Sequence, residues 1–143
     1  MIVRFPLLTI TTPTRGNDTW GSGDFGASRA GRLHMGIDYA AMPGSILQSP
    51  VTGVVTKLGY CYGDDLSYRY VQVTTHDGAR HRFFYIEPDV VLNSQVQEGY
   101  ELGEVQDVTR RYQVPKGMKP HIHYEIIDKD KLYVSPEAYH GRV

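Results

Sequence analysis

An all-β fold is predicted for this chain, and three observations predict it. The 15 glycines and 8 prolines are spread along the sequence and separate short runs rich in Val, Thr, Tyr and Ile, the pattern of strands joined by turns. No segment keeps a 3.6-residue apolar repeat over three turns, so long amphipathic helices are not expected. An Asp-Gly turn signal at Asp77 and Gly78 joins two of the runs as a hairpin. We therefore expect a compact single domain over residues 1–143, built on an antiparallel sheet core.

The expected strands follow one another along the chain and are rich in β-branched and aromatic residues. In order they are Leu7–Thr11, Gly36–Ala40, Gly53–Gly59, Tyr70–Thr75, His81–Ile86, Glu101–Val105 and His121–Ile127. One short helical turn is expected over Val134–Tyr139, with Ser135 at the N-cap and Pro136 at the first helical position.

Composition and charge exclude several classes of function. The chain has 143 residues, 41% of them hydrophobic, and a formal net charge of −1, so neither nucleic acid nor a membrane surface is an expected partner. No apolar run approaches the roughly 18–20 residues of a membrane span. Cys61 is the only cysteine, which excludes an intrachain disulfide and a cysteine-based metal site. Any metal must therefore be held by histidine and carboxylate.

A zinc site is predicted from two pairs of residues that stand far apart in the sequence. His121 and His123 lie two residues apart in an expected strand, so their side chains point to the same face. His34 and Asp38 flank Gly36 and can turn two further ligand atoms toward one point. Two imidazoles and one carboxylate, from His34, Asp38 and His123, suit Zn²⁺ and leave a fourth position for water. Such an open position is typical of catalytic zinc.

His121 is expected to be catalytic rather than a ligand. It shares the face of His123, near enough to reach a water on the metal and to act there as a general base or oxyanion stabiliser. A lone histidine is more often an ordinary surface or core residue, and this alternative stays open for His34 and His121 taken singly.

The long segment between Thr12 and Arg32 leads directly into His34. Loops of this length inside compact domains are usually functional or poorly ordered. We expect Trp20, Phe25 and Arg29 to lie beside the metal groove and to bind substrate; the alternative is a loop that only covers a sheet edge.

The motifs occur in the order found in the lysostaphin-type zinc endopeptidases, and about residues 20–128 resemble that family. The H-x-x-x-D element is at His34 and Asp38, and the H-x-H element is at His121 and His123. Further similar stretches are Phe25–Arg29, Gly36–Ala40, Pro43–Ser45, Ser49–Val55, Val96–Gly103 and Pro120–Glu125.

The resemblance implies a β-sheet core, zinc in a groove floored by the sheet, and cleavage of peptide bonds in bacterial peptidoglycan. The family usually carries a second catalytic histidine in a Y-x-H-L element, and Glu87 stands at its expected position. Tyr85 and Glu87 are expected on one strand face, so both are predicted to point into the groove, Glu87 as a catalytic proton acceptor and Tyr85 as a substrate-binding residue. The alternative for Glu87 is a solvated strand-end residue before Pro88.

Two other functions stay open at this point. One is a catalytically impaired relative that keeps the metal and acts as a structural or wall-binding module. The other is a glycan-binding β domain with accidental histidines. No signal peptide is expected, because Arg4 and Pro6 interrupt the short apolar N-terminal stretch. The expected route to the cell wall is therefore a bacteriophage tail or virion, whose proteins would be partners, or a released lysin.

Overall fold

The computed structural model describes residues 4–6, 15, 17–18, 21–23, 25–26, 28–29, 32–33, 35–112 and 117–141, and most of them lie in or between strands. The strands are β1 (Arg4–Pro6), β2 (Asn17–Asp18), β3 (Gly21–Ser22), β4 (Ser28–Arg29), β5 (Arg32–Leu33), β6 (Ile37–Ala40), β7 (Ile46–Gln48), β8 (Gly53–Tyr60), β9 (Arg69–Thr75), β10 (Arg80–Phe84), β11 (Ile86–Pro88), β12 (Gln95–Val96), β13 (Glu101–Val105), β14 (His121–Ile127) and β15 (Tyr133–Val134). The helical elements are a 3-10 turn, η1 (Val108–Arg110), and one short helix, α1 (Pro136–Tyr139).

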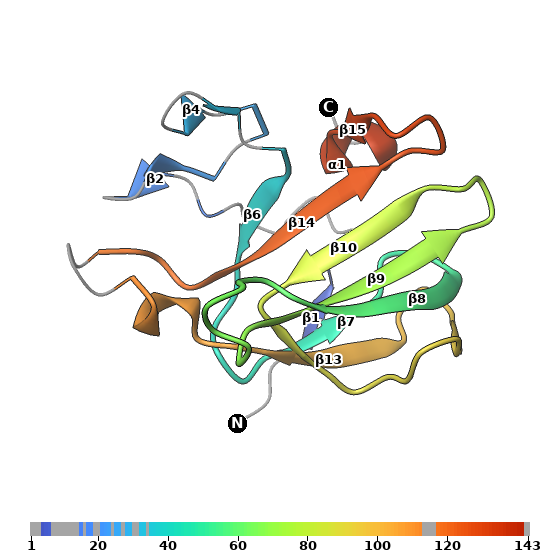
Figure 1. Ribbon diagram of the computed structural model, residues 1–143, viewed down its shortest axis with the longest axis horizontal. Coiled ribbons are helices and arrows are strands. Elements are labelled where there is room, and N and C mark those ends of the chain that lie inside the picture. The colour runs from blue at the N-terminus through green and yellow to red at the C-terminus, as the bar shows by residue number, and fades with distance from the viewer. Residues whose placement is uncertain are drawn as a thin grey trace.

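The larger sheet positions the candidate site. It has 7 strands in the order β12-β8-β9-β10-β14-β15, with β6 also paired to β14. All its pairings are antiparallel. The hairpin of β9 and β10 turns at Gly78, whose φ of 85° is readily adopted by glycine, so the Asp-Gly prediction is confirmed. In Figure 1, β6 lies beside the start of β14, with which it pairs, while α1 and β15 lie at the other end of β14.

The second sheet covers one face of the first. It has 4 strands in the order β1-β7-β13-β11, and its β1–β7 pair is parallel, so the predicted antiparallel sheet holds everywhere in the described strands except at this pair. The hydrophobic core contains residues of both sheets, including Leu47, Ile86 and Leu102 from the smaller one. Val71, Val73, Phe83, Ile122, Tyr124 and Ile126 come from the larger one.

Alternation along β14 separates its two faces. Ile122, Tyr124 and Ile126 enter the core and are at most 1% exposed, which leaves His121, His123 and Glu125 on the opposite face. The strand therefore presents its two motif histidines away from the hydrophobic core.

The structure differs from the sequence-based expectation at two segments, whereas the expected strand Leu7–Thr11 lies outside the described residues and stays a prediction. The expected strand His81–Ile86 ends at Phe84, because Tyr85 has a φ of 72° and cannot continue the pleat. The segment Thr12–Arg32 contains strands of two small ribbons, β2–β3 and β4–β5.

The predicted helical turn is confirmed as α1, which begins at Pro136 with Ser135 at the N-cap position. Ser135 makes no side-chain capping hydrogen bond. Within the described part of the chain, no helix is long and apolar enough to cross a membrane.

Candidate functional site

The pairing of β6 with β14 brings the two sequence motifs together. Asp38 stands opposite His123 in the ladder. One carboxylate oxygen of Asp38 lies 3.0 Å from His123 Nδ1, and the other lies 3.7 Å from His121 Nε2. Asp38 and His121 are each only 3% exposed. His121 and His123 therefore share one strand face, as their two-residue spacing predicts, and both approach the same buried carboxylate.

A second carboxylate orients His123 from the other side of its ring. His123 Nε2 lies 2.9 Å from Glu125 Oε1, and Arg82 holds the other Glu125 oxygen at 3.4 Å. Burial disfavours the charged imidazole, but Asp38 and Glu125 outweigh it and raise the pKa of His123 to about 9. Histidines that bind a metal through one ring nitrogen commonly hold a carboxylate with the other. Glu125 plays that part at Nε2 of His123, which leaves Nδ1, on the side of Asp38, as the nitrogen that would bind a metal.

His121 is held in one tautomer by the backbone. Its Nδ1 lies 2.7 Å from the carbonyl oxygen of Lys119. A carbonyl only accepts, so Nδ1 carries the proton and donates it there. Nε2 of the neutral ring is then left as a proton acceptor directed toward Asp38. Burial lowers the pKa of His121, although the charge of Asp38 opposes this, so the neutral form is favoured.

Glycine at position 36 allows the close packing of this site. A Cβ atom there would lie 2.7 Å from His123 Cε1 and 2.5 Å from the Tyr124 carbonyl oxygen. Any side chain would displace the His123 ring or the strand. His34 lies outside the described residues, so one of the three predicted ligands is not located. Among the residues that are described, no group of three His, Cys, Asp or Glu side chains is arranged to hold a metal.

Arg15 is a site residue that sequence reasoning missed. Its guanidinium lies 2.8 Å from Asp38 Oδ2, and both side chains are at most 5% exposed. The Arg15 amide also donates to the Asp38 carbonyl, while the Asp38 amide donates to Gly23. The segment before His34 thus contacts β6 at Asp38, as its position suggested. No local pattern marks Arg15, because its partner is distant in the sequence.

The prediction that Tyr85 and Glu87 share one strand face is wrong. Tyr85 leaves the larger sheet, and β11, which carries Glu87, pairs with β13 in the smaller sheet. Glu87 is exposed, and its carboxylate lies 3.5 Å from the Gln106 amide. The ring that contacts His121 is that of Tyr85, edge to face with centroids 5.5 Å apart. A left-handed residue breaks the period-2 alternation, so Tyr85 and Glu87 do not share a face.

The three predicted loop residues have different outcomes. Phe25 is partly buried and packs against the hydrophobic core. Arg29 lies in β4, which pairs with β5; Trp20 lies outside the described residues. Their substrate-binding roles stay predictions.

The order of these motifs in the chain matches a known family. A model of peptidase family M23 matches residues 32–136, which include Asp38, His121 and His123. The chain belongs to peptidase family M23. M23 peptidases are generally metallopeptidases of the lysostaphin type that cleave peptidoglycan, and they are typically zinc-dependent.

Solved structures of M23 proteins share the fold. A mutant catalytic domain of the prophage-encoded M23 protein EnpA from Enterococcus faecalis superposes with a TM-score of 0.64 at 20% identity, covering 94% of this chain and 95% of that one. The catalytic domain of lysostaphin from Staphylococcus simulans superposes with a TM-score of 0.61 at 17% identity, covering 87% and 91%.

The M23 chain also has relatives in animals. Leukocyte cell-derived chemotaxin-2 of Mus musculus is 28% identical over 129 residues, which are 85% of this chain and 76% of the mouse protein. The protein of the same name from Bos taurus is 27% identical over 111 residues, covering 78% and 71%.

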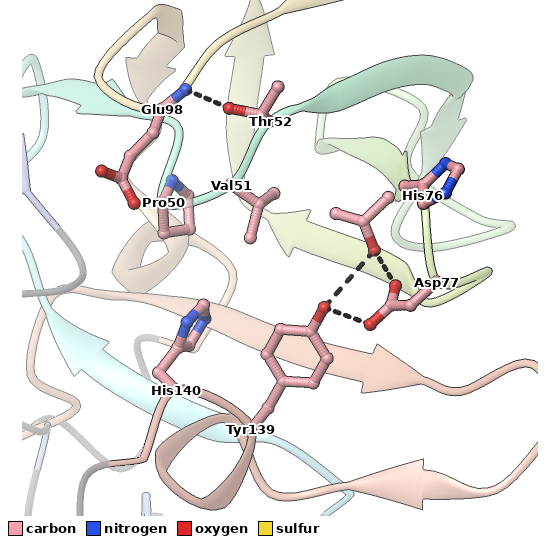
Figure 2. A pocket seen from close by; sticks show the side chains of 9 residues that line it. Pro50, Val51, Thr52, His76, Asp77, Glu98, Tyr139 and His140 are labelled. Atoms are coloured by element: carbon pink, nitrogen blue, oxygen red, sulfur yellow. Dashed lines mark hydrogen bonds between the residues drawn. The ribbon is translucent and has the colours of Figure 1, made fainter.

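A surface hollow of the M23 domain lies at the turn of the β9–β10 hairpin and α1. It is lined by residues that include Thr75, Asp77, Tyr139 and His140. Figure 2 shows the Tyr139 hydroxyl bonded to Asp77, and the same hydroxyl lies 3.5 Å from that of Thr75. These polar groups already satisfy one another, and none of them belongs to the M23 motifs. We therefore place the candidate site at Asp38 rather than in this hollow.

Proposed function

We propose that this chain is a zinc-dependent endopeptidase that hydrolyses peptide bonds of bacterial peptidoglycan. One observation carries the proposal: Asp38, His123 Nδ1 and His121 Nε2 converge, with His123 at 3.0 Å and His121 at 3.7 Å from the carboxylate. The donor set fits zinc, because a carboxylate and a pre-oriented imidazole are ligands that it commonly takes.

The chain's residues divide into ligands and a proton acceptor. His34, Asp38 and His123 hold Zn²⁺ in this proposal, and Glu125 fixes the ring of His123. When bound, zinc polarises a carbonyl and lowers the pKa of water toward about 7. As water adds to the scissile carbonyl carbon, His121 Nε2 takes its proton. The carbon–nitrogen bond then breaks, and His121 returns the proton to the leaving amine.

The direct test is clearing of a peptidoglycan suspension by the zinc-loaded chain. We expect the turbidity to fall, a chelator to stop the fall, and added zinc to restore it. His140→Gln, at the far side of β14, is the matched control and should clear as the wild type does. A chain that binds zinc stoichiometrically yet releases no peptide from any wall type would contradict the endopeptidase proposal.

A second candidate function is a zinc-stabilised structural or wall-binding module without turnover. The observation that favours it is the place of Glu87. The family usually carries a second catalytic histidine at this position, whereas Glu87 is exposed and its carboxylate lies 3.5 Å from the Gln106 amide. Pelleting with insoluble peptidoglycan separates the two candidates. A module stays bound to the wall without releasing soluble amines, whereas an endopeptidase releases them.

Delivery by a phage particle completes the proposal. The chain would act on the wall as part of a bacteriophage tail or virion, or as a released lysin. Its detection in purified virions by mass spectrometry tests the first route.

A further inference from the structure

Tyr85 has a backbone position that is uncommon for a bulky residue. Its φ is 72°, in the left-handed region, which costs a non-glycine residue conformational energy and often marks functional sites. Its amide donates to Arg69 of β9, and its carbonyl accepts from Gln106, which follows β13. Both sheets thus hold Tyr85 at the point where the chain passes from one to the other. The conformation directs its ring against His121.

A chain of tyrosine hydroxyls ends at Tyr85. Tyr62 donates its hydroxyl proton to the Tyr85 oxygen at 3.2 Å, and the Tyr62 and Tyr112 hydroxyls are 2.8 Å apart. Tyr62 has only one proton, so Tyr112 must be the donor to Tyr62. The proton of Tyr85 is then left for an acceptor beyond these two. Successive hydrogen bonds polarise each other, so Tyr85 is a stronger donor than an isolated phenol.

Arg111 packs against the middle member of this series of tyrosines. The Arg111 guanidinium lies 3.6 Å from the centroid of the Tyr62 ring and is paired with Asp64 at 3.0 Å. The Tyr62 ring also stacks on Tyr85, with centroids 6.2 Å apart. These contacts limit the freedom of the Tyr85 hydroxyl before any ligand arrives.

The site around Asp38 has an acceptor but lacks a matching donor on His121. His121 uses its Nδ1 proton on Lys119, so Nε2 can take a proton from water but cannot initially donate one. Hydrolysis of an amide places negative charge on the carbonyl oxygen, and this oxygen needs a hydrogen-bond donor. Tyr85 touches His121 and has a proton to give.

We propose that the Tyr85 hydroxyl donates a hydrogen bond to the carbonyl oxygen of the scissile peptide bond as that oxygen becomes negative. This inference rests on the proposed endopeptidase function. It assigns the roles of general base and of hydrogen-bond donor to the oxyanion to different side chains. His121 takes the proton from water, and Tyr85 binds the carbonyl oxygen. The Tyr85 hydroxyl keeps its proton throughout, so no proton is added to or removed from the reaction described above.

The surroundings of Tyr85 keep it protonated at neutral pH. Burial raises the pKa of Tyr85, the hydrogen bond from Tyr62 opposes this, and the negative charge of Asp38 adds to the rise.

Binding of a tetrahedral analogue tests this inference without turnover. The probes are a phosphinic tetraglycine, whose anionic oxygen imitates the reacting carbonyl, and tetraglycine itself; glycine keeps side-chain selectivity out of the comparison. With the zinc-loaded wild type, calorimetry should show tighter binding of the phosphinate. Tyr85→Phe keeps the ring but removes the donor, and should weaken phosphinate binding by roughly tenfold or more. Its binding of tetraglycine should change by less than about twofold.

Two further variants separate donation from packing. Tyr62→Phe removes only the relay and should give a smaller loss in the same direction. Tyr139→Phe, a hydroxyl deletion at the far hollow, should leave both affinities unchanged. Equal loss for both probes in Tyr85→Phe, no loss for either, or no phosphinate preference in the wild type would each overturn the inference. Absence of peptidoglycan cleavage together with the expected phosphinate pattern would instead contradict only the endopeptidase function.

Discussion

Strand β14 separates two groups of histidines that differ in what they contact. On its outer face, His121 and His123 approach the Asp38 carboxylate, and His123 also meets Glu125. On its core face, His81 Nδ1 lies 2.7 Å from the Tyr124 hydroxyl, which lies 2.9 Å from His140 Nε2. One group is built around carboxylates and the other around a phenol.

The difference in partners separates the pKa of His123 from the pKa values of the core-face histidines. Carboxylates outweigh burial and raise the pKa of His123 to about 9, whereas burial lowers the pKa values of His81 and His140 to about 4. The core-face histidines therefore stay neutral at pH 7 and serve packing and hydrogen bonding. The comparison teaches that carboxylates raise the pKa of a buried histidine only where they outweigh its burial, as Asp38 and Glu125 do at His123; at His121 burial prevails over Asp38 and the pKa is lowered.

Loss of His123 should have the largest effect. His123→Ala removes one of only three proposed protein ligands, so we expect loss of stoichiometric zinc and of all hydrolysis. His140→Ala, from the opposite face, should keep full zinc occupancy. Metal analysis of the two purified variants is the measurement, and full zinc occupancy in His123→Ala would remove His123 from the ligand set.

Loss of His121 should affect the rate but not the metal. His121→Ala removes the proton acceptor, which typically contributes on the order of 10²–10⁴ in rate. Zinc content should remain that of the wild type. The rate of amine release per bound zinc is the quantity to compare. If zinc and activity fall in proportion, His121 is a ligand and its proposed role is wrong.

Acid sensitivity should come from the core-face group. Folded His81 has a pKa of about 4, below its ordinary value of 6.5, so between these values the unfolded chain binds a proton that the folded chain does not. His81 alone should therefore make the free energy of unfolding rise as pH increases through this window, by up to roughly 3 kcal/mol. His140, whose pKa is also lowered to about 4, adds to the rise. His81→Asn can keep a hydrogen bond to Tyr124 and should remove the part of the rise that His81 contributes.

Urea unfolding at several pH values between 4 and 7 measures that rise. His76→Asn, on an exposed turn residue nearby, is the matched control and should keep the wild-type slope. An unchanged slope in His81→Asn would show that another group carries the acid sensitivity.

Substitution of Glu87 should have the smallest effect. If Glu87 were catalytic, Glu87→Ala or Glu87→His would change turnover by at least tenfold, about 1.4 kcal/mol in barrier, with zinc affinity little altered. Its exposed place beside Gln106 leads us to expect less, and less than for Tyr85→Phe. A tenfold change in either variant would return Glu87 to the catalytic group.

Much of the fold was predictable because it depends on local patterns. Side chains alternate along a regular strand, so the shared face of His121 and His123 follows from their spacing alone. The β9–β10 hairpin follows from Asp77 and Gly78, because glycine readily adopts the positive φ that the turn needs. The strands Glu101–Val105 and His121–Ile127 have the predicted bounds. Asp38 lies beside His121 and His123 of β14, as expected from the two motifs that carry these residues.

Other features were decided only by the tertiary structure. Arg15 meets Asp38 because a distant segment folds onto β6, and no local pattern encodes such a contact. Tyr85 takes the place beside His121 because the chain changes sheets there through a left-handed residue, which rotates the side chains that follow. A single positive φ in a bulky residue is selected by the contacts of both sheets rather than by its own preference. The sequence alone determined which histidines share a face, and the fold decided which aromatic ring faces them.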